Sequence, residues 1–173
     1  GSTTGTASFT PTDDTTYEGN ETGIVAISGV SGADAAEDGT QSVTITITED
    51  DSAPTVTLAT SASSIAENAG SSLTLTATLS IATTADVTVA LSTSGTGTEG
   101  TDYSTISDIT ISAGATTGTA SFTPTDDSIY EGNETGIVAI STVSGGSATE
   151  DGTQSVTITI TENETAPVVN LSV

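Results

Sequence analysis

The sequence predicts an all-β protein, built as a seven-stranded antiparallel β-sandwich with immunoglobulin-like layering. Apolar residues alternate with Thr over several short stretches, which is the period of a strand that buries one face. Apolar residues make up only 33% of the chain, against ~45–50% in an ordinary domain. The predicted core is therefore thin, as it is between two packed sheets whose outer faces carry the β-branched Thr. No amphipathic helix pattern of useful length appears.

Seven segments carry this alternation. In one of them Leu73, Leu75 and Ala77 alternate with Thr, and Gly, Ser and Asn turns separate the segments. The rings of Phe122 and Tyr130 are expected in the core. In chain order we expect strands at 55–60, 72–80, 86–93, 107–112, 117–124, 135–143 and 154–161.

The chain repeats itself at an offset of 113 in residue number. The segment YEGNETGIVAIS at Tyr17 recurs at Tyr130, and residues 1–60 match residues 114–173 at 46 positions. A fixed period indicates a repeat architecture, and this one exceeds the ~20–50 residues of solenoid repeats. Each unit is long enough to have its own core, so we expect tandem repeats with this period, joined by linkers.

Two linkers set the boundaries of the repeats, because at 52–54 and 165–167 a Pro follows an acidic cluster. A repeat that lacks some of its strands exposes a sheet edge, and pairing with a neighbouring copy is one way to cover it. Gly1-Ser2 is typical of a cloning scar and the repeat starts in mid-pattern, so we expect a segment of a longer protein whose targeting signals lie elsewhere. The expected divisions are the C-terminal part of one repeat at 1–51, a linker at 52–54, a complete repeat at 55–167 and the first strand of the next at 168–173.

The charge is entirely negative. The chain has 23 Asp and Glu and no Lys, Arg or His, so no carboxylate can pair with a basic side chain. Neutralisation has to come from solvent cations, a bound metal or another molecule, while nucleic acid and anionic membranes are repelled. No apolar run approaches the ~20 residues that cross a bilayer. An acidic surface made for solubility is the alternative, although it does not explain where the acids cluster.

Catalytic chemistry has few side chains to use. Without His, Cys or Lys there is no usual base for a serine nucleophile, no thiol and no Schiff-base amine. A glycosidase needs two carboxylates across a sugar cleft, but 3 Tyr, 2 Phe and no Trp leave few rings to stack a sugar. We expect that the protein is not an enzyme.

The acids concentrate in predicted loops. The densest run is DDSIYEGNE at 126–134, and two carboxylates ~4 Å apart repel by ~4 kcal/mol at an effective dielectric of about 20. Calcium would offset this repulsion, because it is a hard cation that takes several oxygen ligands in irregular geometry. The ENE triplet at 162–164 follows the last strand and is predicted at the same pole, which Glu67 and Asp102 can also reach. The alternative for each acid is a solvated residue that initiates a turn.

Four motifs in order carry a resemblance to a known family: ENAG at 67–70, GTDYS at 100–104, the loop at 126–134, and a terminal strand that runs into acids. Together they resemble the Calx-beta domain of sodium/calcium exchangers, an integrin subunit and many large bacterial surface proteins. The resemblance covers the complete repeat and both flanking pieces. It implies a seven-stranded sandwich whose distal loops hold a cluster of Ca2+ ions.

The resemblance also implies the ligands. The family often ends in three consecutive acids, and Asn163 departs from that pattern, so fewer ions or weaker binding are expected in the complete repeat. The preceding repeat keeps all three acids but lacks counterparts of Glu67 and Asp102, so its site is expected to be partial. The implied ligands are Glu67, Asp102, Asp126, Asp127, Glu131, Glu134, Glu162 and Glu164 in the complete repeat, with Asp13, Asp14, Glu18, Glu21, Glu49, Asp50 and Asp51 in the preceding one.

These expectations combine into a mechanical function. We expect a calcium-binding repeat that forms and rigidifies the stalk or filament of a secreted or cell-surface protein of adhesin or matrix type. Its partners are neighbouring repeats and, in a fibre, other copies. The alternative is a calcium-dependent adhesion or ligand-binding module, which needs a concave site lined by aromatic residues. A calcium sensor, as in the exchangers, is a third reading that tandem copies do not favour.

Overall fold

The computed structural model describes residues 3–172 and contains only strands as regular elements in that range. Residues 1–2 and 173 lie outside it, so the expected cloning scar and the last residue of the expected strand at 168–173 are not described. Within the described range, no helix is long and apolar enough to cross a membrane.

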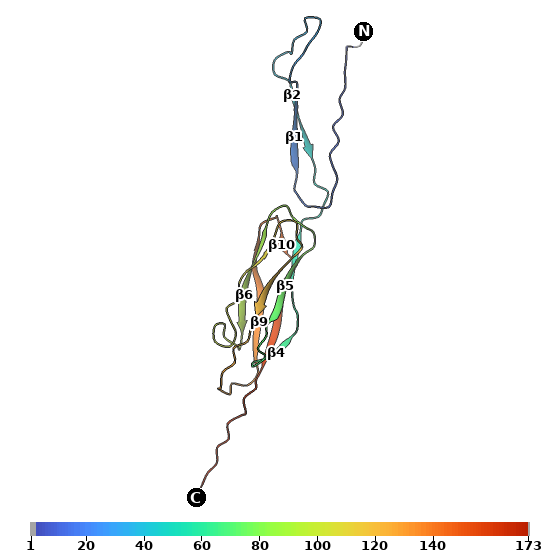
Figure 1. The fold of residues 1–173 in the computed structure, drawn as a ribbon. Coiled ribbons are helices and arrows are strands. Elements are labelled where there is room, and N and C mark those ends of the chain that lie inside the picture. The colour runs from blue at the N-terminus through green and yellow to red at the C-terminus, as the bar shows by residue number, and fades with distance from the viewer. Residues whose placement is uncertain (1–2, 173) are drawn as a thin grey trace.

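Residues 54–164, here called the sandwich, form two packed sheets (Figure 1). Their strands are β3 (Thr55–Thr60), β4 (Ser64–Ala66), β5 (Leu73–Leu79), β6 (Val87–Gly95), β7 (Ile109–Ile111), β8 (Thr117–Phe122), β9 (Glu134–Ser144), β10 (Thr149–Glu150) and β11 (Ser155–Thr161). One sheet has the order β10-β3-β5-β8, and the other has the order β4-β11-β9-β6-β7.

The expected count of seven strands was wrong. Each expected segment contains a strand, but β4 and β10 add two short strands at the sheet edges. They pair parallel with β11 and β3, so the sheets are not purely antiparallel as we expected. The segments of β4 (SIA) and β10 (TE) lack the alternation of apolar residues with Thr, which the similarly short β7 (ITI) shows.

The core lies between the two sheets and uses the alternate positions of the strands. Phe122 is fully buried, as expected, and stacks on Tyr103 with ring centroids 4.6 Å apart. Gly136 lies beneath this pair, where a Cβ atom would be 2.7 Å from the Phe122 ring. Tyr130 is 45% exposed, so the expectation that it belongs to the core was wrong. Tyr103 takes that place because the loop between β6 and β7 folds over the end of the core.

Residues 3–51, here called the N-terminal segment, form a separate hairpin beyond one end of the sandwich, and the C-terminal residues extend from the opposite end (Figure 1). Strands β1 (Glu21–Ala26) and β2 (Ser42–Ile47) pair with the same register as β9 and β11, once the repeat offset is applied. Phe9 lies 3.5 Å from the position of a Cβ on Gly23, as Phe122 lies over Gly136. The repeated sequence therefore folds in the same local way twice.

The junction between the N-terminal segment and the sandwich is shorter than the expected linker. Pro54 is fully buried, and its carbonyl accepts a hydrogen bond from the Thr149 N–H at 3.1 Å. Tyr17 and Thr83 form a parallel β-bridge across the junction. Pro54 thus packs as part of the sandwich, which leaves two residues, Ser52 and Ala53, between it and the acidic cluster.

Candidate metal centre

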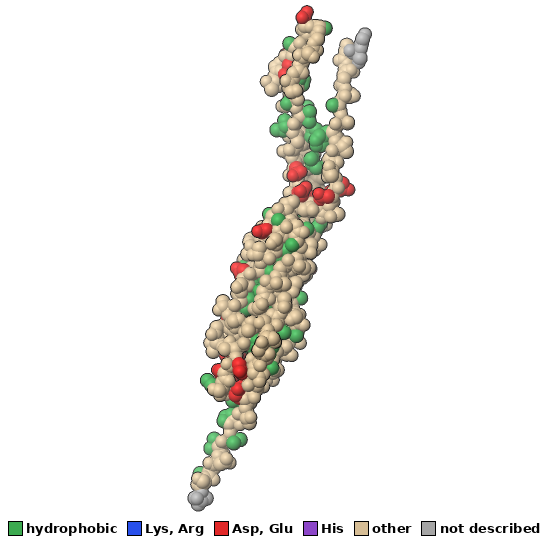
Figure 2. Space-filling view, viewed as in Figure 1, with side chains coloured by type: hydrophobic (Ala, Val, Ile, Leu, Met, Phe, Trp, Pro, Cys, Tyr) green, Lys and Arg blue, Asp and Glu red, His purple; other side chains and the backbone are tan. Residues whose placement is uncertain are grey.

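The order of the strands brings the predicted ligands of the sandwich to one pole. Strand β4 runs parallel to β11, and both end where β9 begins, because β9 is antiparallel to β11. Glu67 follows β4, the acidic loop at 126–134 leads into β9, and the triplet at 162–164 follows β11. Asp102 comes from the loop between β6 and β7. Figure 2 shows acidic side chains at this pole and again where the hairpin meets the sandwich.

Glu67, Glu162 and Glu164 form the first carboxylate group, with one oxygen from each within 4.8 Å of the others. The Oε2 atom of Glu164 is buried and has no hydrogen-bond partner. A hydrogen bond shared with Glu162, together with desolvation and the charge of Glu67, raises the pKa of Glu164 to about 7. Backbone N–H donors, first that of Glu164 and then that of Glu131, lower the pKa of Glu162 to about 2. Below about pH 7 the metal-free group therefore holds a proton on Glu164 beside an ionised Glu162.

Glu162 also clamps the acidic loop. Its Oε2 accepts hydrogen bonds from the N–H groups of Glu131 and Gly132, at 2.7 and 2.8 Å. Its Oε1 accepts one from the Glu164 N–H at 2.9 Å, and its own N–H donates to Asn133 Oδ1 at 3.0 Å. The loop and the end of β11 thus form one unit. Sequence reasoning missed the role of Asn133, although an Asn recurs at the same place in both copies.

Asp102, Glu131 and Glu134 form the second carboxylate group, again within 4.8 Å. Asp102 is held from two sides, because its Oδ2 accepts from the Thr98 N–H at 2.6 Å and its carbonyl accepts from the Thr125 N–H at 2.9 Å. Desolvation and then the charge of Asp102 raise the pKa values of Glu131 and Glu134. Three acids from two loops therefore face one another without a basic neighbour.

Asp126 and Asp127 belong to neither group but lie beside the first. The Asp127 N–H donates to Glu67 Oε1 at 3.3 Å, and its Oδ1 accepts from the Ile129 N–H at 2.6 Å. Burial is the main cause that raises the pKa of Glu67, and the charges of Asp126 and Asp127 add to it. The structure thus brings six of the eight expected ligands into two groups and places the other two at the border of the first.

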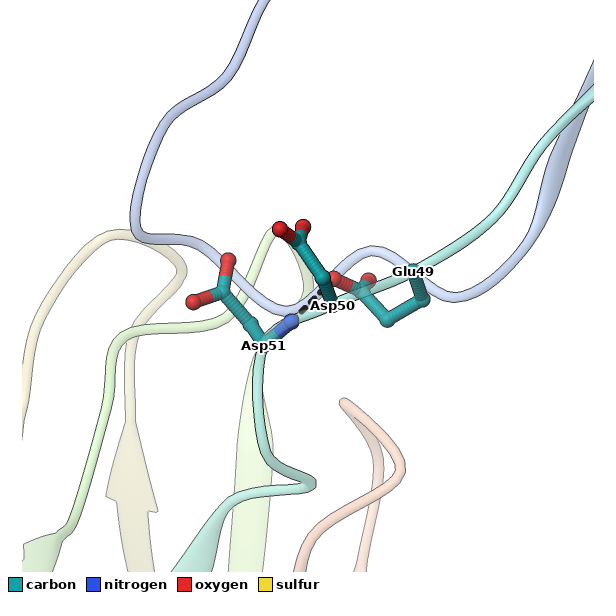
Figure 3. Close-up of side chains that lie close together, drawn as sticks. All are labelled: Glu49, Asp50 and Asp51. Carbon is teal, nitrogen blue, oxygen red and sulfur yellow. Dashed lines mark hydrogen bonds between the residues drawn. The ribbon is translucent and has the colours of Figure 1, made fainter.

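The N-terminal segment repeats the clamp. Glu49 Oε2 accepts from the N–H groups of Glu18 and Gly19, at 2.7 and 2.6 Å, and the Glu49 N–H donates to Asn20 Oδ1 at 2.8 Å. The Asp51 N–H donates to Glu49 Oε1 at 3.0 Å, as Figure 3 shows. The loop conformation is therefore independent of the strands that only the sandwich has.

A third carboxylate group lies here, made of Glu49, Asp50 and Asp51, again within 4.8 Å. Desolvation and then the charge of Glu49 raise the pKa of Asp51, while backbone donors, first the Asp51 N–H, lower the pKa of Glu49. A cavity of about 370 Å³ adjoins the group. Its lining includes all seven ligands expected in this segment: Asp13, Asp14, Glu18, Glu21, Glu49, Asp50 and Asp51.

The donor set of all three groups suits a hard cation. Each group offers carboxylate oxygens, which calcium prefers, and the chain has no Cys or His that would favour a softer metal. The buried Oε2 of Glu164 points to the same conclusion, because no N–H or O–H group of another described residue donates to it and an ion can use it as a ligand. The residues present therefore fit an oxygen-coordinated divalent ion.

The comparisons with known proteins agree with this architecture. The family model of the Calx-beta domain matches residues 49–164. A crystal structure of the apo form of the Calx CBD1 domain is similar, with a TM-score of 0.52 and 16% identity over 65% of this chain and 99% of that one. A crystal structure of CBD12 from CALX1.2 has a TM-score of 0.49 and 17% sequence identity, and the match covers 57% of this chain and 40% of that one. None of the curated proteins compared with this chain matches it. At such identities the first solved structure shows a shared fold.

Proposed function

Because the chain belongs to the Calx-beta domain family, we propose that its acidic poles bind calcium and that the bound ions stiffen the junctions between successive repeats. The repeats form the stalk or filament of a secreted or cell-surface protein of adhesin or matrix type. The role is mechanical rather than catalytic. Neighbouring repeats of the same chain are the partners, together with other copies where the protein assembles into a fibre.

The observation that carries the calcium proposal is the first carboxylate group. Glu164 Oε2 is buried beside Glu67 and Glu162, in a chain that has no basic side chain to neutralise these carboxyl groups. Crowding them without a compensating cation raises the pKa values of Glu164 and Glu67, so the ionised, metal-free group is electrostatically unfavourable. A calcium ion supplies the charge and takes the free oxygens, with the ordered loop already held by Glu162.

The position of the third group supports the mechanical role. Only Ser52 and Ala53 separate Glu49, Asp50 and Asp51 from Pro54, which is buried in the sandwich. An ion held there fixes the acidic loop to residues 49–51, and we expect that this ordering of the chain directly before Ser52 and Ala53 restricts motion at the junction. Calcium-binding modules that work outside cells have Kd values of ~0.1–1 mM. Sites of that affinity fill only after export, so the stalk stiffens where it is used.

The test is isothermal titration of calcium into the metal-stripped chain, combined with small-angle scattering before and after loading. Saturable binding together with a longer or stiffer particle is the expected result. The paired substitution Glu67→Gln and Glu164→Gln should remove part of the binding, whereas Asp151→Asn, which lies outside all three groups, should leave it unchanged. Absence of saturable binding at millimolar calcium would mean that the acids serve solubility.

A further inference from the structure

We propose that the tip of each acidic loop is a docking element between repeats. In this chain Tyr17 docks on the end of the sandwich that faces the N-terminal segment, opposite the first two carboxylate groups (Figure 1). Thr83 lies at this end, which is here called the Thr83 pole. The equivalent tip, Ile129–Tyr130, is the surface on which the same pole of a following copy docks. The second half of this proposal rests on the proposed tandem arrangement, and the first half does not.

The contact between Tyr17 and Thr83 is the first observation. The two residues form a parallel β-bridge, so the acidic loop of the N-terminal segment meets the sandwich through its backbone, and Tyr17 as a whole is half-buried. Tyr17 lies within the loop that Glu49 clamps, two residues before Gly19. An ordered acidic loop therefore presents Tyr17 to the sandwich at a defined place.

The receiving pole is tightly built. Thr83 is 1% exposed, its Oγ1 donates to the Ala85 carbonyl at 2.7 Å, and its own carbonyl accepts from the Gly114 N–H at 2.8 Å. Gly146 has a φ of +54°, and a Cβ there would lie 2.9 Å from the Thr83 side chain. Three loops thus hold Thr83 in place, and the pole is a preformed surface rather than a mobile tail.

The two loop tips differ in exposure although their loops are alike. The Thr16 N–H donates to Asp14 Oδ1 at 2.7 Å, and the Ile129 N–H donates to Asp127 Oδ1 at 2.6 Å. Thr16 and Tyr17 are half-buried, whereas Ile129 is 61% and Tyr130 is 45% exposed. Within residues 3–172 the first tip has a sandwich pole against it and the second has none, which leaves the second tip free to make the same kind of contact.

The residues that follow indicate that this partner is another copy. Val169 and Leu171 match Val56 and Leu58 at the repeat offset. Val56 and Leu58 are 0% and 7% exposed in the core, whereas Val169 and Leu171 are 99% and 98% exposed. In the sandwich, this first strand is tied to the loop that leads to Thr83, because the Ser80 N–H donates to the Thr55 carbonyl at 2.9 Å. A copy that begins at residue 168 therefore brings the same pole next to Ile129 and Tyr130.

The first half of the proposal is tested in the intact chain by pulsed electron paramagnetic resonance. The chain has no Cys, so spin labels on Thr44→Cys and Thr119→Cys, both exposed, report only the distance between the hairpin and the sandwich. Tyr17→Ala and, more strongly, Tyr17→Pro should abolish a single narrow distance, and Tyr130→Ala is the matched control that should keep it. A narrow distance in all three variants would overturn the proposal, as would a broad one in the parent chain.

The second half is tested by nuclear magnetic resonance between two chains at high salt, where charge repulsion is screened. Unlabelled Tyr17→Ala chain, whose Thr83 pole is uncovered, should shift the Ile129 and Tyr130 signals of a labelled parent chain. Unlabelled parent chain should not, because Tyr17 covers its pole. Equal shifts, or none with the Tyr17→Ala chain at millimolar concentration, would overturn this half. Both experiments are run with and without calcium, so a chain that does not bind calcium still tests the docking contact.

Discussion

The repeated segment lies in two different structural surroundings, once in the N-terminal segment and once in the sandwich. In the N-terminal segment Phe9 is 45% and Val25 is 50% exposed, whereas their counterparts in the sandwich, Phe122 and Val138, are fully buried. The hairpin register and the clamp of the acidic loop are nevertheless the same in both places. Local geometry is therefore encoded within the repeated segment, while burial comes from strands that only the sandwich contributes.

The carboxylate groups show the same division. Each group of the sandwich includes one acid from outside the repeated segment, Glu67 in the first and Asp102 in the second. The N-terminal segment has no counterpart of either, and its group consists of consecutive residues, Glu49 to Asp51. The loops can thus form alone, but the two groups of the sandwich need β4 and the loop between β6 and β7.

The largest difference between the N-terminal segment and the sandwich is expected when the equivalent aromatic ring, Phe9 or Phe122, is removed. Phe122→Ala should destabilise the sandwich by ~3–5 kcal/mol, because it leaves a cavity against Tyr103. Phe9→Ala should cost under ~1 kcal/mol because Phe9 is already half in solvent. Urea unfolding followed by tyrosine fluorescence measures both, and equal losses would show that the N-terminal segment has a core of its own.

A second pair of substitutions tests the close approach beneath these rings. Gly136→Ala should cost ~1–3 kcal/mol, because the new Cβ would lie 2.7 Å from the Phe122 ring. Gly23→Ala should be neutral or slightly stabilising, since the corresponding Phe9 contact is 3.5 Å and Ala restricts the unfolded chain. Thermal unfolding of the two variants would decide this, and a stable Gly136→Ala protein would mean that the Phe122 ring has room to shift.

Calcium should stabilise the sandwich through acids that the N-terminal segment does not supply. Asp126→Asn with Asp127→Asn should lower the calcium-dependent stabilisation of the sandwich, which is ~1.4–2.7 kcal/mol when calcium is at about 10–100 times its Kd. The matched change, Asp13→Asn with Asp14→Asn, should leave that stabilisation unchanged, because the first carboxylate group lies elsewhere. Calorimetric melting with and without calcium measures the difference. An unchanged calcium effect in the first variant would remove Asp126 and Asp127 from the ligands.

The smallest expected effect is the pH dependence of the calcium-free sandwich. The pKa of Glu164 is raised to about 7 from its ordinary 4.5, so the folded chain keeps a proton that the unfolded chain releases. The stabilisation of the folded state by this proton is fully present below pH 4.5 and is lost as the pH rises toward 7. Glu162, with a pKa lowered to about 2, acts in the opposite direction, and its contribution is lost as the pH falls from 4.5 to 2.

Melting temperatures in a chelator between pH 4.5 and 8 should therefore fall with pH, and Glu164→Gln should flatten that fall. Asp51→Asn is the counterpart in the N-terminal segment, where the pKa of Asp51 is also raised. It should leave the sandwich profile unchanged. A parent profile that rises with pH over this window would show that Glu164 is ionised throughout.

The residues alone predicted the all-β fold class, a strand within each of seven segments and the loops that carry the acids. These features are local, because the alternation of Thr with apolar residues and the turn residues can be read within one segment. The internal repeat also predicted where equivalent structure occurs, and β1 and β2 follow it. The assignment of calcium ligands remains a prediction that the experiments above test.

The packing of distant segments fixes which acids face one another and which tyrosine ring enters the core. Glu67 and Glu162 lie far apart in the chain and meet because β4, whose segment shows no alternation of apolar residues with Thr, pairs with β11. Tyr103 rather than Tyr130 stacks on Phe122 because a loop folds over the core end, while the tip that carries Tyr130 is exposed to solvent. The partners of these side chains depend on contacts between distant segments, so no local pattern of residues predicts them.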